Sequence, residues 1–156
     1  MESARPFLNV RQEPDLIRVF GAEGEIPAGA AEVRYAEGAL TLRSSVPVTR
    51  IHLRWRGPVR GQFLGDHWER SYADLGWRGE IPGRVMPWSF LVHEGKATHG
   101  YGVMTGAGAM CFWTADAEGI SLWADVRSGG SPVRLGDRTL AAVSYTHLTL
   151  PMILRV

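Results

Sequence analysis

The sequence predicts an all-β protein built as an antiparallel β-sandwich. Three observations support this prediction. Polar and apolar residues alternate over short stretches, and turn residues recur about every 8–12 positions. A third is that no apolar stripe with helical spacing and convincing length occurs between Met1 and Ala142. A chain of 156 residues fits one domain with a substantial core.

The first half of the chain supplies four of the expected strands, at 16–20, 32–36, 39–43 and 46–55, with a loop at 21–29. Glu37-Gly38 lies between the second and third of these and predicts a tight hairpin. In the fourth, alternation places Ile51, Leu53 and Trp55 on one face and His52 and Arg54 on the other. The Gly57-Pro58 pair ends that strand.

The second half is expected to form strands at 84–93, 100–104, 109–113 and 120–126. Pro87 places the start of the first of these at a sheet edge or a bulge, because proline cannot donate to a ladder. Each of these strands is apolar, so we expect Trp88, Trp113 and Trp123 in the core. Cys111, between Met110 and Phe112, is expected to be a core or half-buried thiol.

The composition excludes several classes of function. A formal net charge of +1 gives no electrostatic reason to expect a nucleic acid or a membrane surface as partner. The single cysteine excludes an internal disulfide. Neither His93 with His99 nor Asp66-His67 with Glu69 has the spacing of a familiar metal motif, so we expect no cofactor. Without a signal peptide or a stretch of about 20 apolar residues, a cytoplasmic location is expected.

The stretch 64–78 combines more hydrogen-bonding groups and rings than any other window. The predicted binding residues are Asp66, Trp68, Arg70, Tyr72, Asp74 and Trp77. In an extended chain the first five share one side, and an aromatic ring beside a carboxylate suits the apolar face and paired hydroxyls of a sugar. The alternative is that the charges pair to tie down the loop while the tryptophans cap the core. We expect no catalysis from these carboxylates, because the neighbouring arginines hold them ionised.

The block Gly65-Asp-His-Trp-Glu-Arg-Ser-Tyr-Ala-Asp-Leu-Gly-Trp-Arg78 also carries a family resemblance, which continues through Thr98-His-Gly-Tyr-Gly-Val and Ile120-Ser-Leu-Trp-Ala-Asp. Over roughly residues 60–142 the chain is similar to the N-terminal part of α-galactosidase-like, melibiase-type enzymes, close to glycoside hydrolase family 36.

The resemblance implies a supersandwich-like β domain followed by a (β/α)8 barrel that carries both catalytic aspartates. This chain would then hold no catalytic residue and would be inactive alone. In the full enzyme, a retaining mechanism would cleave terminal α-galactosides. The sandwich loop, here Asp66 and Trp68, would help to shape the sugar subsite, supported by Arg70, Tyr72, Asp74 and Trp77.

The last residues stand apart. Val143-Ser-Tyr-Thr-His-Leu-Thr-Leu-Pro151 resembles a translated transposase-type sequencing adapter, with Met152 where the adapter would give Thr. We therefore expect 1–142 to be the native domain, cut short before its barrel, and 143–156 to be a non-native tail. A sandwich without its barrel would expose an apolar face and tend to self-associate. The alternatives are a free-standing carbohydrate-binding module and a sandwich with no ligand.

Overall fold

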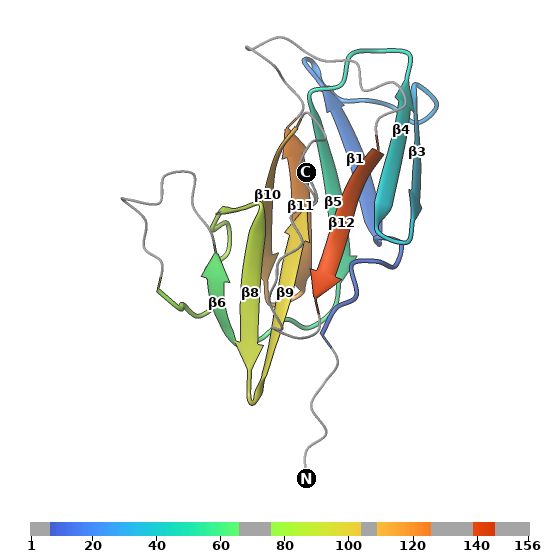
Figure 1. Cartoon of the computed structure of the whole chain (residues 1–156). Coiled ribbons are helices and arrows are strands. Elements are labelled where there is room, and N and C mark those ends of the chain that lie inside the picture. Colours follow the sequence, from blue (N-terminus) through green and yellow to red (C-terminus); the bar gives the residue numbers. More distant parts are fainter. Residues whose placement is uncertain (1–6, 66–75, 104–108, 126–138, 146–156) are drawn as a thin grey trace.

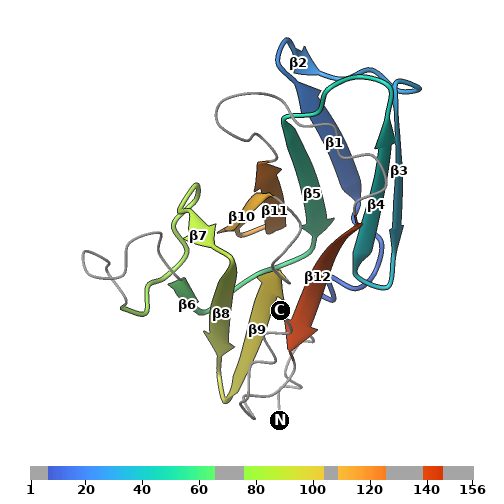
Figure 2. The same ribbon diagram turned by 45° about the horizontal axis from the view of Figure 1, so that its top comes forward.

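The computed structural model describes residues 7–65, 76–103 and 109–125, together with the backbone of 139–145. This part of the chain forms two six-stranded antiparallel sheets that pack as two layers (Figures 1 and 2). The predicted all-β, antiparallel sandwich is therefore confirmed. The described residues contain no helix that is long and apolar enough to cross a membrane.

The first sheet has the strand order β2-β1-β5-β11-β10-β7. Its members are β1 (Leu16–Gly21), β2 (Gly24–Glu25), β5 (Arg50–Arg56), β7 (Met86–Pro87), β10 (Met110–Asp116) and β11 (Gly119–Asp125). Both edge strands, β2 and β7, are two residues long.

The second sheet has the order β3-β4-β12-β9-β8-β6. Its members are β3 (Ala31–Ala36), β4 (Ala39–Ser44), β6 (Gln62–Gly65), β8 (Ser89–Glu94), β9 (Ala97–Val103) and β12 (Thr139–Tyr145). Strand β12 runs across the expected domain boundary, since Ala142 pairs with Val103 and Val143 with Gly102. The non-native origin of 143–156 stays a prediction, and 146–156 lie outside the described residues.

The hairpin predicted at Glu37-Gly38 joins β3 to β4. Both turn residues have positive φ, 50° at Glu37 and 84° at Gly38. Two consecutive positive φ angles are typical of the type I′ turn, whose twist matches that of the strands.

The prediction of a single strand at 84–93 is wrong, because this stretch forms two strands that belong to different sheets. β7 pairs with β10 in the first sheet, whereas β8 pairs with β9 in the second. Trp88 makes the crossing with a φ of 62°; its N–H donates to the Cys111 carbonyl, and its own carbonyl accepts from the N–H of Val103. The prediction that Pro87 lies at a sheet edge is confirmed by the position of β7.

The core lies between the sheets and is rich in rings. Trp113 is fully buried, and its ring lies 5.7 Å from that of Phe90 and 6.1 Å from those of Trp55 and Tyr101. Ile51, Leu53 and Trp55 face this core, as the alternation predicts, and Cys111 is buried. The core assignment of Trp123 is wrong: its side chain lies on the opposite, outer face of the first sheet beside His52. Trp88 is only partly buried but does pack against the core.

Candidate functional site

Of the six predicted binding residues, the structure describes one. The other five, Asp66, Trp68, Arg70, Tyr72 and Asp74, lie outside the described residues. Trp77 is described and is 41 % exposed, with its ring edge-on to that of His93 at 6.1 Å. The next residue, Arg78, is tied to Phe63 of β6 by two backbone hydrogen bonds of 2.6 and 2.9 Å. Trp77 thus stands at the β6 edge of the second sheet, and it does not lie in the core.

A second candidate site, which the sequence argument did not single out, is the outer face of the first sheet. Strand register places four side chains in one row across β1, β5, β11 and β10: Arg18, His52, Trp123 and Phe112. The rings of His52 and Trp123 are 3.8 Å apart and tilted by only 4°. Those of Trp123 and Phe112 are 6.1 Å apart and tilted by 10°. The three rings therefore stand nearly parallel, one on each strand.

Ion pairs flank this row of rings on both sides. Arg50 pairs with Asp125 at 2.9 Å, and Arg54 pairs with Asp116 at 2.8 Å. The Arg50 guanidinium also lies 5.7 Å from the ring centre of Phe112, within the range of a cation–π contact. The face thus combines apolar ring surface with charges that are already neutralised.

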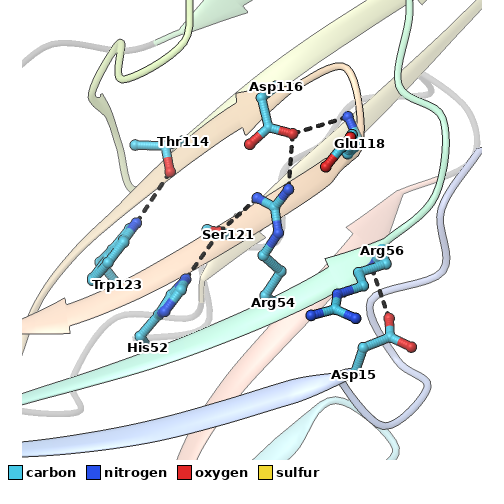
Figure 3. A network of polar contacts seen from close by, with 9 residues as sticks. All are labelled: Asp15, His52, Arg54, Arg56, Thr114, Asp116, Glu118, Ser121 and Trp123. Atoms are coloured by element: carbon cyan, nitrogen blue, oxygen red, sulfur yellow. Dashed lines mark hydrogen bonds and ion pairs between the residues drawn. The ribbon is translucent and has the colours of Figure 1, made fainter. Parts of the chain in front are cut away.

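His52 and Ser121 form the centre of a hydrogen-bond network on this face (Figure 3). The Nε2 of His52 is 3.0 Å from the Oγ of Ser121, and Arg54 donates to that oxygen at 3.2 Å. The same arginine donates to Asp116 at 2.8 Å. On the same side of the row, the Nε1–H of Trp123 donates to the hydroxyl of Thr114, the cross-strand partner of Ser121, at 3.1 Å.

The protonation state of His52 follows from its surroundings. Burial, together with the nearby Arg18 and Arg54, lowers the pKa of His52 to about 4, so its imidazole is neutral at pH 7. Because an arginine can only donate, Ser121 accepts from Arg54 and is free to donate its own proton to the Nε2 of His52.

A serine beside a neutral histidine is the geometry of an activated nucleophile, but the rest of the site does not suit catalysis. Ser121 is only 3 % exposed, and Arg54 already occupies its oxygen. Among the described residues, the Nδ1 of His52 has no hydrogen-bond partner that would orient the ring as a base. The network is therefore a means of joining β5, β10 and β11 through their outer face.

The described part of the chain offers neither a metal-binding cluster nor a reactive thiol. It contains no group of three or more histidine, cysteine or acidic side chains that could hold a metal ion. Burial raises the pKa of the Cys111 thiol to about 12, which keeps it protonated and unreactive at neutral pH.

The geometry of the ring row also bears on sugar binding. A pyranose packs its apolar side against the open face of an aromatic ring. In this row one face of Trp123 is covered by His52, and Phe112 stands parallel on the other side. The row therefore turns ring edges outward, which suits contact with a protein surface better than stacking of a sugar. Trp77 is the more exposed ring.

Comparison of the chain with protein-family models, with curated proteins and with solved structures finds no match.

Proposed function

We propose that the chain is a non-catalytic β-sandwich domain of an α-galactosidase-like glycoside hydrolase that acts on terminal α-galactosides. Its sequence block from Gly65 to Arg78 and its two-sheet architecture support this proposal. In such an enzyme the reacting carboxylates lie on a separate barrel domain. The sandwich contributes a docking surface for the barrel and does not take part in the chemistry.

The observation that carries the proposal is the apolar character of the outer face of the first sheet. It bears Met110, which is 49 % exposed, beside the partly buried rings of Phe112 and Trp123. A sheet face that only meets water is normally polar. The flanking arginines have carboxylate partners, so a second domain could cover this face without burying an unpaired charge.

The test is to recover the source DNA beyond the codon for Ala142 and to express the reading frame found there. We expect the frame to continue into a barrel of about 250 residues. The long protein should hydrolyse p-nitrophenyl α-galactoside, and the present chain should not. A frame that encodes no barrel, or hydrolysis by the chain alone, would overturn the proposal.

A variant and a matched control, both made in the long protein, test whether the barrel docks on this face. Met110→Arg places a charge in the proposed contact and should lower activity by about tenfold, since about 1.4 kcal/mol of docking energy is worth that factor. Ile81→Arg is the control, because Ile81 is also 49 % exposed but lies in the segment between β6 and β7. Equal effects from the two variants would count against docking through the sheet face.

The alternative is a free-standing carbohydrate-binding module, and the exposure of Trp77, a residue of the predicted loop, favours it. Titration calorimetry of the present chain with galactose and α-galactosides separates the two proposals. Binding that is lost in Trp77→Ala would support the module. If the chain binds no sugar and no barrel follows it, only a structural sandwich remains.

A further inference from the structure

The chain enters the sandwich through a segment that both sheets hold in place. This strap, residues 7–12, precedes β1 and is drawn in dark blue (Figure 1). Three aromatic side chains donate to alternate carbonyls of the strap: Tyr101 to Leu8 at 2.9 Å, Tyr35 to Val10, and Trp55 to Gln12 at 2.8 Å. Trp55 belongs to the first sheet and the two tyrosines to the second, so the strap bridges both layers.

His99 of β9 lies beneath the first residue of the strap. Its ring stacks on Phe7 at 5.0 Å with an interplanar angle of 21°, and it also contacts the ring of Tyr101 at 4.5 Å. His99 is only 4 % exposed, and its Nε2 has no hydrogen-bond partner within the part of the chain that the structure describes. It is thus a buried titratable group whose cover is the strap itself.

Of the groups in residues 7–65, 76–103 and 109–125 that face His99, none supplies a compensating charge at Nε2. Its cross-strand neighbour in β8 is Val92, and the strap presents Phe7. Burial raises the pKa of Tyr101, so that hydroxyl stays neutral. Arg60 and Glu94 line the small cavity beside Phe7, but neither binds Nε2.

We propose that the strap is an acid-sensitive latch, closed while His99 is neutral and released when His99 takes up a proton. Protonation would place a charge beneath Phe7, where no described residue offers an acceptor at Nε2, and an uncompensated charge is costly in a buried place. Lifting the strap admits water to the imidazolium and removes that cost. The inference concerns the fold alone and does not depend on the enzyme proposal.

The direction of the effect follows from linkage. Burial lowers the pKa of His99 in the closed state below its ordinary value of 6.5. The open state keeps the ordinary value, so it alone gains protons as the pH falls through that value. The ratio of open to closed strap should therefore rise on acidification, by at most about thirty-fold between about pH 7.5 and about pH 5.

Nuclear magnetic resonance of the whole chain over this pH range tests the latch. The signals to follow are the strap amides, the Trp55 indole N–H that binds Gln12, and the His99 ring protons. We expect the strap amides and the Trp55 signal to move toward the values of a free peptide in step with the titration of His99. A strap whose signals stay constant while His99 titrates would overturn the proposal.

Two variants distinguish strap opening caused by protonation of His99 from other effects of low pH. His99→Phe keeps a ring against Phe7 but cannot be protonated, so its strap should remain closed at low pH. His52→Phe removes a second buried histidine whose pKa is also lowered, and its strap should open as in the unmodified chain. If His99→Phe does not fold, the unmodified chain still decides, because strap and imidazole must titrate together. Strap opening in a folded His99→Phe variant would exclude the latch.

Discussion

The imidazole of His52 lies 3.8 Å from the indole of Trp123, and their planes differ by only 4°. The two residues are direct cross-strand partners on β5 and β11, where neighbouring strands are about 4.8 Å apart. Such close parallel contact leaves no room for water between the rings. It explains why a histidine on the outer face of a sheet is only 7 % exposed.

Removing the indole should reveal how far this outer face stabilises the fold. Trp123→Ala deletes a half-buried ring and uncovers His52, and we expect it to lower the free energy of unfolding by about 2 kcal/mol. Urea denaturation followed by circular dichroism measures this loss. Met110→Ala, on the same face but exposed, is the control and should cost less than about 0.5 kcal/mol. Equal losses would mean that the ring stack adds nothing beyond ordinary surface contact.

His52 should make stability depend on pH. Its pKa of about 4 lies below the ordinary value of 6.5, so its contribution is complete above 6.5 and is lost as the pH falls toward 4. We expect a loss of about 2–3 kcal/mol between about pH 7 and about pH 4.5 from this group. Urea unfolding of His52→Phe at both pH values should show a smaller decrease by that amount. An unchanged pH dependence in the variant would contradict the assignment.

Two arginines of the first sheet allow a matched comparison of ion pairs. Arg54 is 18 % exposed and binds both Asp116 and Ser121, so Arg54→Met should cost about 1–3 kcal/mol of unfolding free energy. Arg18 is 40 % exposed, and its ion pair with Glu25 lies at the surface, so Arg18→Met should leave stability nearly unchanged. Thermal unfolding of the two variants decides, and a larger loss from Arg18→Met would invalidate the ranking.

The alternation of residues was enough to predict the all-β class, the Glu37-Gly38 hairpin and the inward face of β5. Each of these depends on neighbours in the chain, where the period of two and the turn residues act directly. The predicted strand 84–93 failed because a left-handed residue at Trp88 moves the chain between sheets. A glycine in the sequence would have indicated that a positive φ is possible at this position, whereas a tryptophan does not.

The ring row on the outer face could not be predicted for a different reason. His52 and Trp123 are far apart in the sequence, and only the strand order β5-β11-β10 brings His52, Trp123 and Phe112 together. The polar face of β5 was recognised from its alternation. Trp123 was assigned to the core because its strand is apolar on both faces, which leaves its direction open.

The hairpin turn offers a stabilising substitution. Glu37 has a φ of 50°, a conformation that asparagine adopts more readily than glutamate. Glu37→Asn also creates the Asn-Gly pair favoured in type I′ turns, and we expect it to raise the free energy of unfolding by about 0.5–1 kcal/mol. Glu32→Asn, in the edge strand β3, should give no gain. Differential scanning calorimetry of both variants checks the prediction, which fails if the melting temperature of Glu37→Asn does not rise.

The turn between β10 and β11 requires a residue without a side chain at its end. Gly119 lies against the backbone of β5, and a Cβ added there would clash with the carbonyl oxygen of Trp55. Backbone cannot swing aside as a flexible side chain would, so Gly119→Ala should push β5 and β11 apart and cost about 2–4 kcal/mol. At Gly79 an added Cβ meets nothing within 4 Å, so Gly79→Ala should fold as the unmodified chain does. Urea unfolding of the two variants tests this close approach of the strands. If Gly119→Ala is as stable as Gly79→Ala, the backbone of β11 does not lie against that of β5 closely enough to exclude a side chain.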